Sequence, residues 1–170
     1  MKLLQIQRSR KMSDKIKYLI ISLLLFVPLF LNGQNCTNYH IDHCRWADRT
    51  FLYSRQSRSA IFTEGMTSSF SIVVYGGEEY YISVDGHRKL GDIRLRIFED
   101  DEQKTMLYDN AEFRYEQFFY FKISRTRKLI IEVSSEEPKS EKTKDDKYCL
   151  GVLLEFRDTG KPEEKQDVGF

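Results

Sequence analysis

The chain has 170 residues, of which 27 are basic and 26 acidic, so its formal net charge is +1 at pH 7. This balance gives no single-sign field that would favour a nucleic-acid partner. No DNA- or RNA-binding motif is present either, so we expect no nucleic acid among its partners.

The first element is an uncharged apolar run, residues 18–31, which follows several basic residues and ends shortly before Gly33. A membrane-spanning helix needs about 20 apolar residues, whereas this run is shorter and contains Pro28. A basic segment, a short apolar stretch and a small residue are the parts of a secretory signal. We therefore predict a cleaved signal peptide at residues 1–33, with Met12 as an alternative start and an uncleaved anchor as the alternative fate.

The predicted mature chain starts at Gln34 and has 137 residues, a normal size for one domain. The leader holds six basic and one acidic residue, so 21 basic and 25 acidic residues remain and the net charge is near −4. The expected location is the periplasm, the outer membrane or the medium. Membrane contact is expected only through the signal segment before cleavage.

Three cysteines follow the leader, at Cys36, Cys44 and Cys149. In an oxidising compartment an odd count means one disulfide and a free thiol, or a link to another chain. Cys36 and Cys44 are close enough to pair in a short loop. A bridge from Cys149 to either would tie the N-terminal segment to the last strand, and its longer loop would stabilise more. Of these pairings we favour Cys44–Cys149.

Residues 34–52 form a polar segment that carries two of the cysteines. Within it, Cys44, Ala47 and Phe51 are spaced for one face of a short helix over 42–52. The alternative is a loop that leads into a strand, because Thr50 and Phe51 also suit the start of a strand.

After this segment apolar residues alternate with polar ones, the period of a strand with one buried face. Gly76-Gly77 is a two-residue turn that can adopt positive φ without steric penalty, as in hairpins. The expected strands are 59–63, 69–74, 80–85, 93–98, 104–108, 119–123, 129–134 and 148–156.

About eight short strands joined by Gly and Asp turns indicate an all-β fold, an antiparallel β-sandwich or jelly roll over residues 53–158. Within it, the charged stretch 135–146 has no large apolar residue, so we expect a mobile loop there. Residues 159–170 are expected to form a disordered tail.

The stretch 62–133 contains five motifs in order: FTEG at 62–65, GEEYYISV at 77–84, GDIRLRI at 91–97, LYDN at 107–110 and LIIEV at 129–133. With these motifs it resembles the pre-peptidase C-terminal type of jelly-roll domain, which is found beside many secreted bacterial enzymes. The resemblance implies a sandwich fold and a stand-alone, secreted bacterial member of the family. It implies no activity, and the calcium ligands of some members do not match here.

Two clusters of potential metal ligands were weighed. The first contains His40, Asp42, His43 and Cys44, whose spacing is not that of a structural zinc site. The second is acidic, with ligand types that suit calcium, and contains Asp92, Glu99, Asp100, Asp101, Glu102 and Asp109. A polar N-terminal segment tethered by a disulfide explains the first cluster better, and a solvated turn explains the second. We therefore expect no metal and no cofactor.

Catalytic motifs such as G-x-S-x-G, H-E-x-x-H and a glycine-rich phosphate loop are missing from the sequence. We therefore predict an exported, non-catalytic module that binds a protein or envelope component. The predicted contact residues are Arg58, Ser59, Arg94, Arg96 and Tyr81, since arginine and tyrosine are common at protein interfaces. The alternatives are a calcium-stabilised carbohydrate-binding module and a small hydrolase with its site in strand-end loops.

Overall fold

The computed structural model describes residues 35–136 and 146–160. The predicted signal peptide at 1–33 lies outside these residues, as do 137–145 of the predicted charged loop and 161–170 of the predicted tail. The chain divides into two units after Asn35, and the fold is that of the second unit, which begins at Cys36. None of the helices in the described part is long and apolar enough to cross a membrane.

The described residues form nine strands, one short α-helix and two 3-10 helices. The strands are β1 (Leu52–Tyr53), β2 (Arg58–Phe62), β3 (Thr67–Val74), β4 (Glu78–Gly86), β5 (Ile93–Glu99), β6 (Met106–Asp109), β7 (Phe118–Ile123), β8 (Arg127–Ser135) and β9 (Tyr148–Asp158). The helices are α2 (Tyr39–Asp42), η2 (Arg88–Leu90) and η3 (Asn110–Phe113). The prediction of an all-β antiparallel sandwich is confirmed, and each of the eight expected strands has a counterpart.

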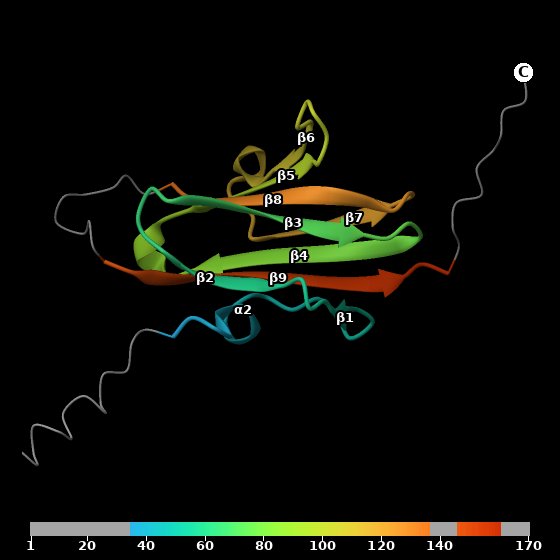
Figure 1. The fold of residues 1–170 in the computed structure, drawn as a ribbon. Coiled ribbons are helices and arrows are strands. Elements are labelled where there is room, and N and C mark those ends of the chain that lie inside the picture. The colour runs from blue at the N-terminus through green and yellow to red at the C-terminus, as the bar shows by residue number, and fades with distance from the viewer. Residues whose placement is uncertain (1–34, 137–145, 161–170) are drawn as a thin grey trace, which may run out of the picture. The chain divides into compact units, whose positions relative to one another are not determined.

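The strands form two sheets that pack as layers (Figure 1). One sheet has the order β1-β9-β4-β7, with β2 also paired to β9; the other has the order β3-β8-β5-β6. We call them the β9 sheet and the β8 sheet. Every pairing is antiparallel, and β9 is the hub of its sheet because β1, β2 and β4 all bond to it.

The core lies between the sheets and comes from the alternating apolar residues that the sequence predicts. Tyr80, Ile82 and Val84 of β4 and Leu150, Val152 and Leu154 of β9 face Leu95, Ile97, Leu129, Ile131 and Val133 of the other layer. Burial of each large apolar side chain stabilises the fold by about 1.5–3 kcal/mol. This layer of side chains is the main stabilising contribution.

The Gly76-Gly77 turn connects the two layers, which corrects its interpretation as a hairpin turn. β3 and β4 belong to different sheets and share no ladder. Gly77 has φ 86°, a left-handed conformation that favours glycine. A Cβ on Gly76 would lie 2.8 Å from the carbonyl oxygen of Ser124, so only glycine fits without movement.

The predicted helix over 42–52 is wrong, because the only α-helix described, α2, ends where it was expected to begin. The backbone of this segment is bonded to side chains of the β9 sheet instead. The carbonyl of Arg45 accepts hydrogen bonds from Tyr81 and Ser83, and the amide of Ala47 donates to Glu155. Backbone groups engaged in this way are not available for the helical i to i−4 pattern.

Two boundary predictions also change. Ser135, expected in the mobile loop, is the last residue of β8 and its hydroxyl donates to the carbonyl of Leu90 at 2.6 Å. Thr159, expected in the disordered tail, donates from both its amide and its hydroxyl to the carbonyl of Gly77. These bonds fix the two residues against neighbouring turns.

Candidate binding site at the open edge of the sandwich

The structure does not bring the five predicted contact residues together. Arg58 and Ser59 lie on β2 and Tyr81 on β4, whereas Arg94 and Arg96 lie on β5 of the opposite sheet. Arg58 is exposed at the β2–β3 side of the sandwich, with its guanidinium 5.8 Å from the ring centroid of Phe70. The five residues therefore do not form one surface.

Tyr81 is buried rather than exposed, which corrects its assignment as a contact residue: only 1% of its surface is accessible. Residues 36–53, here called the N-terminal strap, cover the outer face of the β9 sheet where Tyr81 lies. Its hydroxyl donates to the carbonyl of Arg45 in the strap at 2.9 Å. On the same face Gly151, Leu153 and Glu155 are buried as well.

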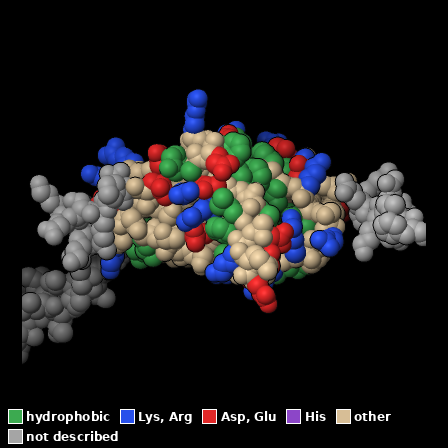
Figure 2. Space-filling view, turned by 90° about the horizontal axis from the view of Figure 1, so that it is seen from above, with side chains coloured by type: hydrophobic (Ala, Val, Ile, Leu, Met, Phe, Trp, Pro, Cys, Tyr) green, Lys and Arg blue, Asp and Glu red, His purple; other side chains and the backbone are tan. Residues whose placement is uncertain are grey.

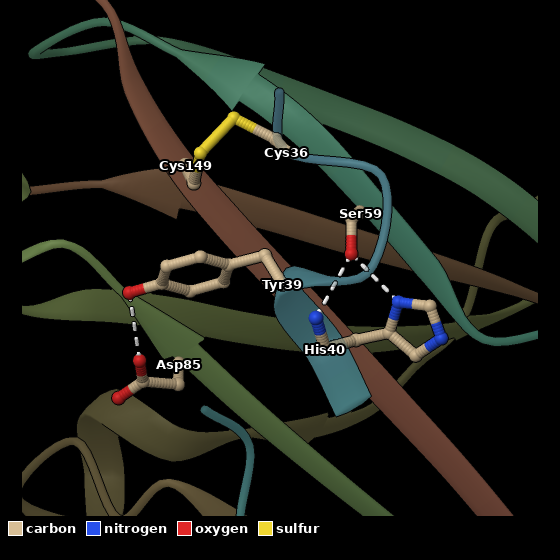
Figure 3. Close-up of a disulfide and its surroundings, with 6 residues drawn as sticks. All are labelled: Cys36, Tyr39, His40, Ser59, Asp85 and Cys149. Carbon is tan, nitrogen blue, oxygen red and sulfur yellow. Dashed lines mark hydrogen bonds between the residues drawn. A yellow bond between two sulfur atoms is a disulfide. The ribbon is translucent and has the colours of Figure 1, made fainter. Parts of the chain in front are cut away.

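The strap is fastened covalently by a disulfide between Cys36 and Cys149 (Figure 3). The favoured pairing Cys44–Cys149 is therefore wrong, although a link from the N-terminal segment to the last strand was expected. Cys44 is a free, buried thiol, and burial raises its pKa to about 12. The spacing of cysteines alone could not distinguish Cys36 from Cys44, since both precede the sheet.

Two side-chain bonds next to the disulfide hold α2 on the sheet. The Tyr39 hydroxyl donates to the Asp85 carboxylate at 3.0 Å (Figure 3). The Ser59 hydroxyl oxygen accepts the backbone amide of His40 at 2.9 Å and lies 2.6 Å from His40 Nδ1. The Ser59 hydroxyl thus forms hydrogen bonds within the fold, so it has less hydrogen-bonding capacity left for a partner.

A serine hydroxyl within bonding distance of an imidazole is also the pairing that nucleophilic enzymes use. Here His40 is buried, and its Nε2 lies 3.0 Å from the Tyr53 hydroxyl. Burial lowers the pKa of His40, which favours the neutral ring. We interpret the contacts of His40 with Ser59 and Tyr53 as a hydrogen-bond network that attaches the strap to β2.

Arg94 and Arg96 are engaged in ion pairs on the outer face of the β8 sheet. The Arg94 guanidinium forms a forked contact with Asp109, with the closest approach 2.6 Å, and Arg96 pairs with Glu132. Seen from this side, basic and acidic side chains are interspersed (Figure 2). The two arginines are therefore partly compensated by carboxylates of this sheet.

Neither cluster of potential metal ligands converges. Within residues 35–136 and 146–160, no group of three or more His, Cys, Asp or Glu side chains is placed to hold a metal ion. Several of the acidic residues bind cations of the chain instead: Glu99 pairs with Arg127, and Asp100 with Lys128.

A pocket of about 150 Å³ opens where the edge strands β6 and β7 face each other across the sandwich. Its apolar lining comes from both sheets and includes Ile97, Leu107, Tyr108, Phe119, Phe121 and Leu129. An apolar cavity of this volume accommodates one benzene-sized group. Its shape and chemistry suit a single apolar side chain.

Stacked aromatic rings line this edge from the surface into the core. Phe113, 53% exposed, stacks on Tyr108 at 5.6 Å between ring centroids, and Tyr108 stacks on Phe119 at 3.9 Å. The stack continues through Phe121 to Tyr80. The inner end of this stack, Tyr80, belongs to the core.

The rim of the pocket combines exposed apolar and basic side chains. Met106 and Leu107 are 49% and 43% exposed on β6. Lys122, Ile123 and Arg127 complete the lining. Exposed apolar groups next to a surface pocket are typical of sites that bind other molecules.

The sequence prediction missed this site because Phe119 and Phe121 fit the inward positions of a strand. The available signal was Met106-Leu107, two adjacent apolar residues in a short strand where alternation allows only one to face inward. One of them had to be exposed.

Neither a protein-family model nor a curated protein matches the chain. Among solved structures, one similar chain is the crystal structure of Aeromonas hydrophila PliG, a periplasmic lysozyme inhibitor of g-type lysozyme. The identity is 11%, the TM-score is 0.40, and the match covers 66% of this chain and 90% of that chain. A TM-score of 0.40 is too low to establish a shared fold.

Proposed function

We propose that the protein is an exported, non-catalytic module that binds another protein as an accessory factor of the cell envelope. The observation that carries the proposal is the apolar pocket between β6 and β7, which is open to solvent and flanked by exposed Met106, Leu107 and Phe113. Protein interfaces concentrate their binding energy in such apolar anchor sites.

Two features support export. The disulfide between Cys36 and Cys149 is of a kind that persists in oxidising compartments. The apolar run at 18–31 has the composition of a secretory signal. Periplasm, outer membrane and medium are all consistent with these features, and membership of the pre-peptidase C-terminal type stays a prediction of the sequence.

Site-specific photo-cross-linking in intact cells tests the binding function. A cross-linking residue at Leu107 is expected to capture a defined protein of the envelope, whereas one at Ser69, an exposed position on the opposite edge strand β3, is not. Equal labelling from both positions, or none from Leu107, would contradict the proposal. N-terminal sequencing of the exported chain tests cleavage after Gly33.

A carbohydrate-binding module is the second candidate, favoured by two exposed rings on the strap. Trp46 and Tyr53 are 44% and 41% exposed, with ring centroids 6.1 Å apart. Sugars stack on exposed aromatic rings of this kind. Glycan binding that Trp46→Ala abolishes and Leu107→Glu leaves unchanged would favour this candidate over the first.

A further inference from the structure

The edge strand β7 presents backbone groups that no other strand of the described residues uses. The amide of Val84 on β4 donates to the carbonyl of Gln117, which sets the hydrogen-bonding side of this ladder. Bonding sides alternate along a strand. The backbone groups of Phe118, Tyr120 and Lys122 therefore point away from β4, at the outer edge of the β9 sheet.

A strand added beside β7 would continue the β9 sheet past its present edge. Its alternate side chains would then point toward the β8 sheet, as Phe119 and Phe121 do on β7. The pocket lies in this inter-sheet space at the same edge, and its volume of about 150 Å³ matches one apolar side chain. The free edge and the pocket thus suit one extended segment.

The charges at this edge favour an acidic segment. Among the described residues Lys122 has no ion-pair partner, because Glu79, its cross-strand neighbour, is bonded to Arg157. Arg127 pairs with Glu99, yet its side chain remains 36% exposed. An uncompensated lysine beside the pocket selects for a carboxylate next to the apolar side chain.

On the opposite side of the sandwich, the edge strand β3 is partly occupied by a side chain. The side-chain amide of Gln56 donates to the carbonyl of Val73 at 2.9 Å and accepts its amide at 2.8 Å. Gln56 therefore occupies part of the β3 edge in the way a neighbouring strand would. The side at β7 combines a free edge with an apolar pocket.

We propose that β7 receives an extended segment of the partner protein by strand addition, with an apolar side chain in the pocket and an adjacent acidic residue at Lys122. Such addition obtains affinity from main-chain hydrogen bonds and specificity from the side chains that enter pockets. The inference rests on the proposed function, since it states how the bound protein is recognised.

Short synthetic peptides serve as the probes, each a threonine-rich extended sequence with one central leucine. One peptide has aspartate on both sides of the leucine, a second has lysine there, and a third has alanine in place of the leucine. Only the aspartate–leucine peptide is expected to bind the full chain well. Hydrogen exchange should then show new protection of the Tyr120 and Lys122 amides.

Two variants of Lys122 distinguish the contribution of its backbone amide from that of its side-chain charge. Lys122→Pro removes the outward amide while the bonds to β4, made by the odd-numbered residues, remain. It is expected to weaken binding at least about tenfold. Lys122→Thr keeps the backbone amide but removes the charge. Its affinity for the aspartate peptide should therefore fall only a few-fold, and it should no longer distinguish aspartate from lysine peptides. Leu107→Glu, with Leu107→Met as its matched control, tests the pocket without altering β7.

The results discriminate between this inference and the proposed function. Unchanged affinity of folded Lys122→Pro, or protection of β3 amides in place of β7 amides, would overturn strand addition. A concentration-dependent dimer that Lys122→Pro abolishes would assign the edge to a second copy of the chain and also overturn it. A protein cross-linked at Leu107 whose capture Lys122→Pro does not reduce would leave the proposed function standing and refute strand addition.

Discussion

Gly151 on β9 lies directly under the backbone of His40, so closely that a Cβ on Gly151 would be 2.6 Å from His40 Cα. Two main chains can approach to this distance only where one residue has no side chain. The contact fixes how near the strap lies to the β9 sheet.

Gly151→Ala is therefore expected to displace the strap, because the atom that it meets belongs to the backbone and not to a flexible side chain. We expect a loss of about 1–3 kcal/mol in the free energy of unfolding, the range for overpacked sites. Denaturant titration measures it. Ser71→Ala, at an exposed position of β3, is the control and should change stability by no more than about 0.5 kcal/mol. Equal values for both variants would contradict the close contact.

Loss of the disulfide should destabilise the fold strongly, because Cys36 and Cys149 are separated by 113 positions and the bridge restricts a very long loop. Cys36→Ser combined with Cys149→Ser is expected to lower the free energy of unfolding by about 2–5 kcal/mol. The control is Cys44→Ala, which keeps the bridge and should change less. A non-reduced digest must yield the Cys36 and Cys149 peptides joined; a Cys44–Cys149 product would refute the assignment.

The buried carboxyl group of Glu155 predicts a pH dependence of stability. Burial raises its pKa, so between its unfolded and folded pKa values the native state binds more protons than the unfolded state. The stability from this group is complete below the unfolded pKa and is lost as pH rises through the folded pKa. Glu155→Gln should remove that loss while still accepting the Ala47 amide. Denaturant titrations from pH 4 to 8 measure the difference between the two proteins, and parallel curves would contradict it.

Asp109 predicts the opposite dependence. Its hydrogen bonds from Arg94 lower its pKa, so this stability is present above the unfolded pKa and is lost as pH falls through the folded pKa. Arg94→Ala leaves a buried carboxylate without its cation and should cost about 1–3 kcal/mol near pH 7. NMR titration should show the Asp109 pKa rising in the variant. Arg96→Ala, which breaks a more exposed pair with Glu132, is the control and should cost less.

The strands could be predicted from the sequence because their inward residues repeat with period two, as Ile93, Leu95 and Ile97 do on β5. The sheet assignment could not, because Gly76-Gly77 permits a tight turn without specifying which layer the next strand joins. Local spacing carries no information on pairing between segments far apart in the chain.

The strap explains why Tyr81 was wrongly predicted to be a contact residue. Tyr81 alternates correctly with the core residues of β4, so the sequence places it on the outer face, where the structure also has it. What alternation does not show is that residues 36–53 cover that face. Gly151 and Leu153, at outward positions of β9, were the available indication, since neither is typical of a solvated strand face.

Because β9 follows all the other described strands yet lies in the middle of its sheet, β2 and β4 are not joined to each other until β9 is present. The covalent ring from Cys36 to Cys149 closes at the same late moment. The β9 sheet can therefore be completed only after all the other described strands have been synthesised.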